Sequence, residues 1–399
     1  MPPRVAQVTA DTFRELSRER RLLADLDDEI LRTQVEVTQI AAPTGAERNR
    51  AQWVAAEFGR AGLRASMDEA GNVIARAPGA YAEAPVVVCA HLDTVFTEDT
   101  SLTLRREGAR IVAPGICDNG RGLAVMLVLA RVLEWCRASF ARAIEFVATT
   151  GEEGAGDLRG AKFYLASGVR PFAVIALDGA GDERVVNTAL GSRRFRIAYR
   201  GPGGHSWAAF GAPNPVHAAA RAATNLASLR VRGAGRSALS VSRIGGGVSI
   251  NAIPEEAWLE IDSRSTSDAT LDLLEREIRA IAAAAAFQEN ERRIPTTPAL
   301  TYRVDRIGDR PSGQTMGDAP LVVAALEATR LVGRAPELGT ASTDANAAIA
   351  AGAPAIAIGG GGRGGDAHTS HEWFDNTSST AGVERALTIV ATMARLAAD

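Results

Sequence analysis

Short apolar runs alternate with amphipathic helical segments over the first half of the chain. Residues 86–90 (Val-Val-Val-Cys-Ala) are apolar at every position, which is typical of an interior strand in a sheet covered on both faces. Further strands are predicted at residues 63–67, 72–76, 143–148 and 172–177. Helical periodicity is found at residues 1–41, 46–60, 122–135 and 158–165. Strands that alternate with helices in this way predict an α/β sheet.

The pattern changes near Gly191 and changes back near residue 308. Half-exposed strands and two helices follow in the order strand-helix-strand-strand-helix-strand, at residues 193–200, 215–229, 238–244, 257–263, 271–287 and 299–307. This order is typical of a ferredoxin-like unit. The first pattern then returns, with elements predicted at 321–331, 354–358 and 382–396. We therefore predict a discontinuous domain of residues 1–191 and 308–399, with a smaller domain of residues 192–307 inserted into it.

Composition and charge narrow the class of protein. The 399 residues are 46% hydrophobic, enough for large cores, and the formal charge is only -3. Without a clustered basic excess, nucleic acid and anionic membrane surfaces are not expected partners. The N-terminus carries charges along its length and has no apolar segment typical of a secretory signal. Cys89, Cys117 and Cys136 form no CxxC pair, and we expect a reducing, cytoplasmic setting.

Imidazoles and carboxylates follow the predicted interior strands, at the point where each strand ends. These candidates are His91, Asp93, Glu152, Glu153, Asp178, His368 and His371, with Asp118 in a turn that leads into a helix. In open α/β sheets, ligands bind outside the carboxyl ends of the strands. Clustered carboxylates repel one another and need a cation. Mixed histidine and carboxylate ligands favour zinc or a similar first-row divalent ion over calcium or magnesium.

Two spacings indicate how such a site would work. His91 and Asp93 are two residues apart at a strand end, so both can lie on one side, where the carboxylate can accept the second ring N–H of a metal-bound histidine. Glu152 and Glu153 are adjacent and diverge in extended backbone. One of them can bind metal while the other acts as a general base toward water.

Two other features suggest different chemistry but lack its context. Residues 359–364 satisfy G-x-G-x-x-G after a strand, but they lead to His368 and not into a helix, as a dinucleotide site would require. Cys117 lies beside Asp118, and no oxyanion-hole motif accompanies it as a cysteine nucleophile would need. We interpret the glycine run as a loop and Cys117 as a small packed hydrophobe.

In this order the motifs resemble the M20 metallopeptidases, a co-catalytic di-zinc family that also contains amidohydrolases. The resemblance runs from about Asp28 to the C-terminus, and the block at 201–215 is most similar to the peptidase T-like branch. The matching motifs are His91-x-Asp93, Gly115-x-x-Asp118-Asn119-Gly120, Glu152-Glu153, Asp178, Gly203-Gly204-His205-Ser206, Asn251, Asp262-Ser263-Arg264, Thr343-Asp344-Ala345-Asn346 and His368-x-x-x-Glu372.

The resemblance implies a mixed-sheet, zinc-peptidase-like catalytic domain with helices on both faces and an inserted ferredoxin-like lid and dimerisation domain. It implies two divalent ions per chain, zinc with cobalt or manganese as alternatives. His91 and Asp178 would hold one ion, Glu153 and His368 the other, and Asp118 would bridge them. The family pattern has an acid four positions after the ligand histidine. Glu372 stands four positions after His368, so the resemblance selects His368 over His371.

The resemblance also implies catalytic and substrate-binding roles. Asp93 would orient His91, and Glu152 would be the general base. His205 would reach the active site of a partner in a homodimer and stabilise the oxyanion, while Asn251 and Arg264 would contact the polar end of the substrate. We expect a metal-dependent aminopeptidase-like hydrolase of short peptides. An amidohydrolase of N-acyl amino acids, or a binding protein without catalysis on the same scaffold, are the alternatives.

Overall fold

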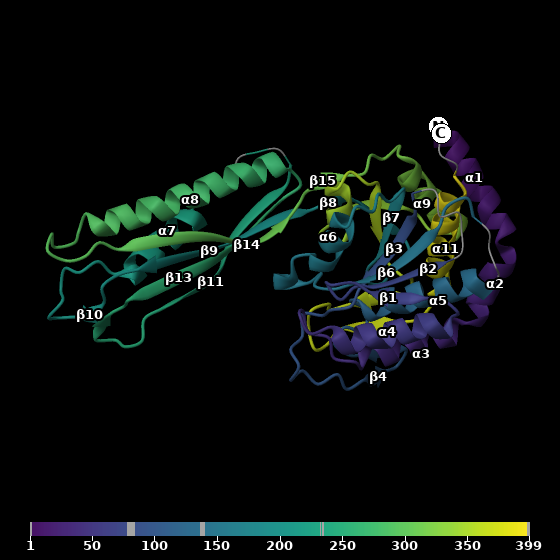
Figure 1. Cartoon of the computed structure of the whole chain (residues 1–399), viewed down its shortest axis with the longest axis horizontal. Coiled ribbons are helices and arrows are strands. Elements are labelled where there is room, and N and C mark those ends of the chain that lie inside the picture. The colour runs from purple at the N-terminus through teal and green to yellow at the C-terminus, as the bar shows by residue number, and fades with distance from the viewer. Residues whose placement is uncertain (1, 78–83, 136–139, 232, 234, 397–399) are drawn as a thin grey trace. The chain divides into compact units, whose positions relative to one another are not determined.

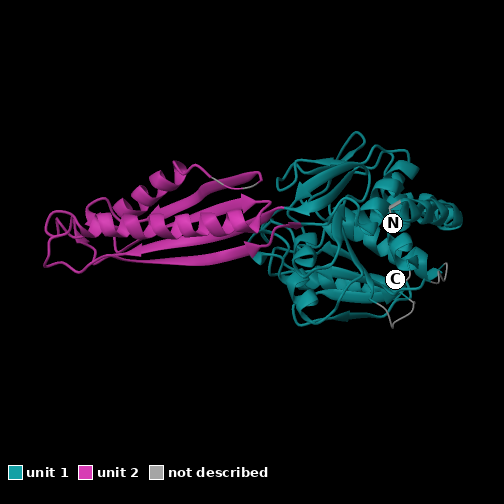
Figure 2. Cartoon of the chain, turned by 90° about the horizontal axis from the view of Figure 1, so that it is seen from above, with its two compact units in different colours: residues 1–189, 314–399 teal, residues 190–313 magenta. Residues whose placement is uncertain are grey.

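The computed structural model describes residues 2–77, 84–135, 140–231, 233 and 235–396, and it divides into two compact units (Figure 2). Unit 1 comprises Met1–Ala189 and Gln314–Asp399, and unit 2 is the intervening segment Leu190–Gly313. The boundaries expected from sequence, at 191/192 and 307/308, both fall inside unit 2. The first and last strands of unit 2 pair with each other, so the chain enters and leaves the unit at neighbouring points.

A mixed sheet forms the centre of unit 1 (Figure 1). Its strands lie in the order β1-β2-β6-β3-β7-β17-β8-β15, and β16 also pairs with β8. Strands β6, β3, β7 and β17 run parallel, whereas β1, β2 and β8 pair antiparallel with their neighbours β2, β6 and β17. The strands are β1 Ala65–Met67, β2 Val73–Ala77, β3 Val86–His91, β6 Ile144–Thr149, β7 Ala173–Leu177, β8 Arg184–Ala189, β15 Gly313–Gln314, β16 Glu337–Ala341 and β17 Ala355–Ile358.

Helices cover both faces of this sheet, as predicted, because its interior strands are apolar on both sides. Val86, Val88 and Ala90 of β3 belong to one core, and Val87 and Cys89 belong to the other. The larger core takes residues from α1 Pro2–Glu15, α2 Ser17–Asp25, α3 Asp27–Thr38, α4 Arg48–Arg60, α5 Gly120–Trp135, α9 Pro320–Leu331 and α11 Thr380–Arg395. The smaller core takes residues from α6 Arg159–Ala166 and α10 Ala345–Ala350, and the 3-10 turn η1 Gly154–Gly156 precedes α6.

A small antiparallel sheet in unit 1 was not predicted from the sequence. It joins β4 Arg105–Glu107, β5 Arg110–Val112, β19 Trp373–Asp375 and β18 Arg363–Gly365, in that spatial order. Phe374 and Ile111 are its buried centre, together with Ile116 and Cys117. This packing brings the glycine-rich segment after β17 next to the turn that carries Asp118.

Unit 2 has the ferredoxin-like element order predicted from the sequence. Its antiparallel sheet has the order β11-β13-β9-β14, and helices α7 and α8 pack on one face of it (Figure 1). The buried positions of β13 alternate strictly with half-buried ones, as expected for a sheet with one covered face. The elements are β9 Gly191–Arg200, β10 Gly204–His205, α7 Pro215–Ala227, β11 Ser237–Gly246, β12 Ala252–Ile253, β13 Glu256–Ser265, α8 Asp268–Asn290 and β14 Thr301–Arg310.

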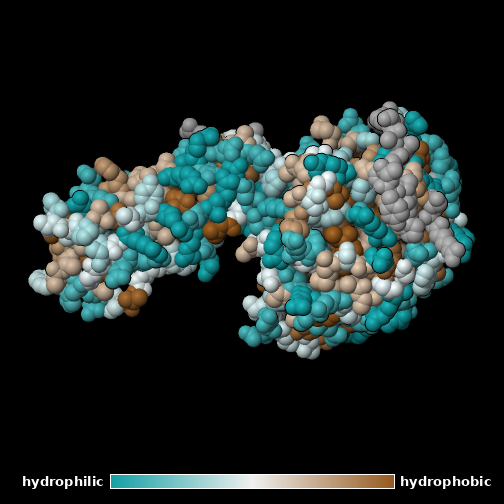
Figure 3. Space-filling view, viewed as in Figure 1, coloured by the Kyte–Doolittle hydropathy of each residue, from teal (hydrophilic) through white to brown (hydrophobic). Residues whose placement is uncertain are grey.

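The surface and the cysteines agree with the composition. Within the described residues, none of the helices combines the length and apolar character needed to cross a membrane. On the face of unit 1 seen in Figure 3, hydrophilic and hydrophobic residues are interspersed. Cys89 and Cys117 are buried free thiols, and Cys136 lies outside the described residues.

Candidate metal centre

The carboxyl ends of β6, β3 and β7, which are parallel neighbours, meet at one edge of the sheet. Strand β3 ends on His91, Glu152 and Glu153 follow β6, and Asp178 follows β7. Asp118 arrives from the turn before α5. Side chains from four separate segments are thus carried to the edge where open α/β sheets bind their ligands.

The carboxylate of Asp118 lies between the imidazole rings of His91 and His368. Its Oδ1 is 3.0 Å from His91 Nε2, and its Oδ2 is 3.1 Å from His368 Nε2. His368 Nε2 also lies 2.9 Å from Glu153 Oε1. His91, Asp118 and Glu153 each place a ligand atom within 4.8 Å of the other two, as donors to a shared cation would.

The contacts of Asp118 fit a metal ligand. Its Oδ1 is buried and, within the described part of the chain, makes no hydrogen bond of acceptable geometry, although His91 Nε2 is 3.0 Å away. Two ligands of one zinc ion come nearly as close, because tetrahedral bonds of about 2.0–2.2 Å place their atoms roughly 3.3–3.6 Å apart. Imidazole and carboxylate are also the donors that zinc and similar divalent ions take. The residues present therefore fit a divalent cation.

The charges of the cluster depend on one another. Burial lowers the pKa of His91, but its carboxylate contacts, Asp118 first, outweigh burial and raise that pKa well above its ordinary value. Hydrogen bonds to Asp118 and then Glu153 raise the pKa of His368 to about 10. Burial, followed by the nearby Asp118, raises the pKa of Asp178 to about 7. In the chain alone, protonated imidazoles balance the negative charge of the carboxylates. A bound divalent cation would supply that positive charge instead, and the imidazoles would then be neutral.

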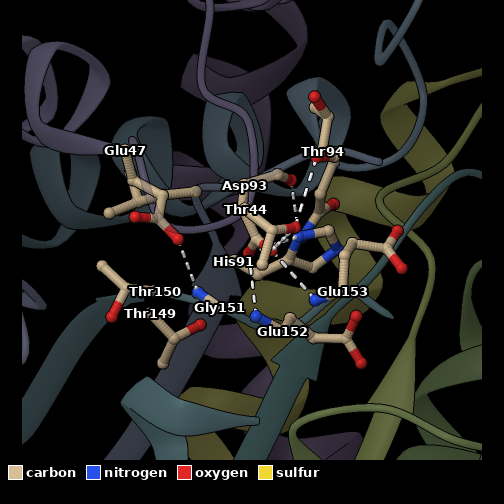
Figure 4. Close-up of polar contacts among 12 residues, drawn as sticks. Thr44, Glu47, His91, Asp93, Thr94, Thr149, Thr150, Gly151, Glu152 and Glu153 are labelled. Carbon is tan, nitrogen blue, oxygen red and sulfur yellow. Dashed lines mark hydrogen bonds and ion pairs between the residues drawn. The ribbon is translucent and has the colours of Figure 1, made fainter. Parts of the chain in front are cut away.

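Asp93 holds the loop that carries the two adjacent glutamates (Figure 4). Its Oδ1 accepts the backbone N–H of Glu152 and its Oδ2 accepts that of Glu153, both at 2.9 Å. The hydroxyl of Thr44 donates to Oδ2 at 2.8 Å. The contact with His91 differs from the expected one, because ring Nδ1 lies 3.0 Å from the main-chain oxygen of Asp93 and 3.7 Å from its carboxylate. The Asp93 carbonyl orients the ring, and the carboxylate positions both glutamates.

Glu47 supports the same loop and was not found from the sequence. Its buried carboxylate accepts the backbone N–H groups of Gly45 at 2.8 Å and Gly151 at 3.0 Å, and Arg159 Nη2 lies 3.2 Å away (Figure 4). Gly151 immediately precedes Glu152, so Glu47 ties the loop before α4 to the loop of the glutamates. The only sequence signal is an acid three residues after Thr44 in a Pro-Thr-Gly turn.

Glu372 holds the turn that carries Asp118. Its fully buried carboxylate accepts the backbone N–H groups of Gly115 at 3.0 Å, Cys117 at 2.7 Å and Asp118 at 2.8 Å. Burial raises the pKa of Glu372 to about 7, although these three hydrogen bonds oppose that shift. Glu372, which follows His368 by four positions, thus supports the turn of Asp118, a different segment of the cluster from the loop of His368. The Asp118–Asn119 peptide bond in this turn is cis.

The structure separates the two candidate histidines of the C-terminal loop. The ring of His368 reaches Asp118 and Glu153, whereas His371 is exposed and its main-chain N–H donates to Thr369 Oγ1. The glycine run before them leads into β18 and not into a helix, as expected for a loop. Burial, and then Glu372 and Asp118, raise the pKa of Cys117 far above its ordinary value, which suits a packed thiol and not a nucleophile.

Three predicted site residues belong to unit 2. His205 on β10 is opposite Ala252 of β12, and the N–H of Ser206 donates to the carbonyl of Asn251 at 2.9 Å, so His205 and Asn251 lie together. The ring Nδ1 of His205 accepts the N–H of Trp207 at 3.2 Å. Arg264 lies at the far end of β13, where its Nε donates to Asp262 Oδ2 at 2.7 Å.

The family model of peptidase family M20/M25/M40 matches residues 87–396 of this chain. Solved structures share the fold at low sequence identity. The aminopeptidase PepT from Bacillus cereus has a TM-score of 0.73 and 20% identity, with 92% of this chain and 99% of that chain covered. A dinuclear metal-binding M20 peptidase from Bacillus subtilis has a TM-score of 0.67 and 17% identity, covering 93% and 99%. An amidase of the hydantoinase/carbamoylase family from Burkholderia vietnamiensis has a TM-score of 0.68 and 18% identity, covering 94% and 97%.

Proposed function

The chain belongs to peptidase family M20/M25/M40, and on that premise we propose that it hydrolyses peptide or other amide bonds at the metal centre of unit 1. The observation that carries this proposal is the carboxylate of Asp118 between His91 and His368, with Glu153 in reach of His368. A carboxylate that contacts two histidines from separate segments of the chain is suited to bridge two cations. The relatives of similar fold include a dinuclear metal-binding peptidase.

The proposed cofactor is a pair of divalent ions, zinc with cobalt or manganese as alternatives. His91 and Asp178 would hold one ion, His368 and Glu153 the other, and Asp118 both. Bound divalent cations supply a Lewis acid for the scissile carbonyl and lower the pKa of water toward neutrality. The raised pKa of Asp178, at about 7, agrees with a carboxylate that needs a neighbouring cation to ionise fully.

Glu152 is the proposed general base. It is buried in the same loop as Glu153, and Asp93 fixes both backbone positions. In Figure 4 the two glutamate side chains leave the backbone in different directions, which leaves Glu152 for proton transfer while Glu153 faces His368. Glu152 accepts a proton from the attacking water and delivers it to the leaving amine. His205 donates a hydrogen bond to the carbonyl oxygen as negative charge develops there.

We propose a homodimer in which His205 and Asn251 act on the partner's substrate. The separation of these residues from Arg264 supports the proposal. His205 pairs with Ala252, just before β13 begins at Glu256. From Glu256 to Arg264, eight residues along β13 span roughly 26 Å at about 3.3 Å per residue. A tripeptide is only about 10 Å long when extended. One copy of unit 2 therefore cannot bring His205 and Arg264 to the same short substrate, whereas two copies can.

The proposed substrates are short peptides, of the kind that an aminopeptidase of the peptidase T-like branch cleaves. An N-acyl amino acid is the second candidate, and the likeness to an amidase favours keeping it. Arg264 suits both, since its guanidinium matches a carboxylate bidentately and both substrate classes carry one. The buried free thiols Cys89 and Cys117 suit the cytoplasmic setting that we propose.

The test joins metal content with activity. Divalent metal per chain is measured by mass spectrometry after dialysis, with and without added zinc, and the loaded protein is screened with dipeptides, tripeptides and N-acyl amino acids. About two ions per chain and hydrolysis of one substrate class support the proposal. Protein that binds no metal tightly even after zinc addition contradicts it and leaves a binding protein on this scaffold.

A further inference from the structure

A large cavity within unit 1 shares a wall with the metal centre. It measures about 1120 Å³, and its lining includes Asp118 and Asp178 at one side. Pockets that bind small molecules usually measure about 300–1,000 Å³, so this one is large enough for a substrate side chain together with its backbone. Every lining residue belongs to unit 1, and the cavity therefore exists in a single copy of the catalytic unit.

Glycines form much of one wall and leave Arg363 as its charged side chain. Strand β18 consists of Arg363 followed by Gly364 and Gly365, and a Cβ on Gly364 would come within 2.2 Å of Cys117 Sγ. The strand backbone therefore packs directly against the residue that precedes Asp118. This approach accounts for a glycine at position 364, and Arg363, one residue earlier, is among the residues that line the cavity.

The other two arginines of the lining are held by hydrogen bonds of their side chains. Arg334 donates from Nε to Asp182 Oδ2 at 2.8 Å. Arg184 donates to the carbonyl of Thr340 at 2.5 Å, and it lies opposite Glu337 in the β8–β16 pairing and beside Glu183 in sequence. These charged groups stand together on the segments around β8.

Arg363 is different. Among the described residues, its exposed guanidinium makes neither a hydrogen bond nor an ion pair. Its cross-strand neighbour Asp375 accepts hydrogen bonds from the main chain and hydroxyl of Thr377. These bonds, and then the charges of Arg363 and Arg110, lower the pKa of Asp375. Arg363 therefore acts on Asp375 through its charge alone, and its fork of N–H donors can bind whatever occupies the cavity.

We infer that this cavity accepts an acidic side chain of the substrate and that Arg363 binds its carboxylate. The inference rests on the proposed function and names its substrate class as peptides or N-acyl amino acids with Asp or Glu beside the scissile bond. A guanidinium pairs with a carboxylate through two parallel hydrogen bonds, which an amide of the same shape cannot reproduce. The cavity thus discriminates between acidic residues and their amides, a property separate from recognition by Arg264 in unit 2.

The test uses pairs of substrates that differ only in carboxylate and amide. Metal-loaded protein is assayed with Ala-Glu and Ala-Gln, Glu-Ala and Gln-Ala, and N-acetyl-glutamate and N-acetyl-glutamine. In at least one pair we expect kcat/KM to be about 10- to 100-fold higher for the acidic member. Arg363→Gln should remove that preference by lowering only the value for the acidic member. Arg363→Lys should keep part of it.

Arg110→Gln is the matched control. Arg110 flanks Asp375 in the same small sheet, and its guanidinium stacks on Trp373 at 3.9 Å, but it does not line the cavity. It should keep the full preference. Equal cleavage of both members of every pair by the unaltered protein overturns the inference. So does an equal loss for both members in Arg363→Gln, or loss of the preference in Arg110→Gln.

Calorimetry separates this inference from the proposed function. If no substrate is turned over, the hydrolase proposal fails. Whether the cavity binds an acidic side chain is then decided by the binding of Ala-Glu and Ala-Gln to the metal-loaded protein. Tighter binding of Ala-Glu that Arg363→Gln abolishes supports the acidic subsite. Equal binding, or no binding of either peptide, overturns it.

Discussion

Glu372 accepts the main-chain N–H of Asp118 at 2.8 Å, so an acid that follows His368 by four residues holds the carboxylate that His368 contacts. The two sides of the metal centre, one from the turn before α5 and one from the C-terminal loop, are therefore positioned by each other. The link is main-chain geometry and does not require Glu372 itself to bind metal.

Glu372→Gln should weaken the metal centre without removing a ligand. The amide replaces one acceptor oxygen with donors that face the N–H groups of Gly115 or Cys117. We expect metal affinity to fall about 10- to 100-fold, as for other residues that orient ligands. Unfolding free energy should fall by about 1–3 kcal/mol, because buried N–H groups lose their acceptor. Metal titration and denaturant unfolding measure these effects. Glu36→Gln, on the exposed face of α3, should change neither, and unaltered affinity in Glu372→Gln would contradict the assignment.

Glu152→Gln and Glu153→Gln should separate proton transfer from metal binding. Glu152→Gln should keep its metal and lose about 10²- to 10⁴-fold in kcat, because its amide cannot accept the proton from water. Glu153→Gln should lose metal as well, because Glu153 is part of the cluster with His91 and Asp118. Metal content and turnover are measured on the same samples. Near-normal turnover in Glu152→Gln would remove it as the general base.

His368→Gln and His371→Gln should differ in metal stoichiometry. We expect His368→Gln to lose about one ion per chain, since its ring is the one within reach of Asp118 and Glu153. His371 is exposed, and its ring nitrogens are not in the cluster, so His371→Gln should retain both ions. Mass spectrometry after dialysis measures the difference. The reverse result would move the ligand role to His371.

Mixing two inactive variants should restore activity if His205 acts across a dimer. His205→Ala and Glu152→Gln are each expected to be nearly inactive alone. In a hybrid dimer, one site then combines an intact Glu152 with an intact His205 from the other copy. The purified hybrid, with one working site of two, should show about half of the normal activity, and random exchange of subunits about a quarter. Co-expression of both variants with different tags, followed by tandem purification, measures it. A purified hybrid as inactive as its parents would show that His205 does not act in trans.

Much of the fold could be predicted because it depends on local periodicity. The apolar run at residues 86–90 became the fully buried strand β3, and alternation over residues 257–263 became the half-covered strand β13. Where the pattern was weak, prediction failed. Strand β8 was not predicted, and neither were β18 and β19, which have three residues each. Strands β8 and β19 form by pairing with β17 and β5, which are distant in sequence, and two of the three residues of β18 are glycines. Intrinsic strand preference is too small to mark such segments.

The candidate site was predictable for a related reason. His91 ends a strand, Glu152 and Asp178 each follow one, and parallel strands bring such positions to one edge of a sheet whatever the details of packing. The supporting residues carry no such pattern. Glu47 and Glu372 act through main-chain N–H groups 104 and 254–257 residues away, and a sequence does not record which carboxylate will accept from which turn.

The sequence by itself determined the alternation of strands and helices, the insertion of a ferredoxin-like unit and the gathering of imidazoles and carboxylates at strand ends. These follow from side-chain periodicity and chain direction, which are local properties. Only the tertiary structure decided that His368 and not His371 faces Asp118, that the Asp93 carboxylate holds Glu152 and Glu153, and that Arg363 lines a cavity beside them. These choices depend on which buried polar groups find partners when distant segments pack, and that is settled only by the folded chain as a whole.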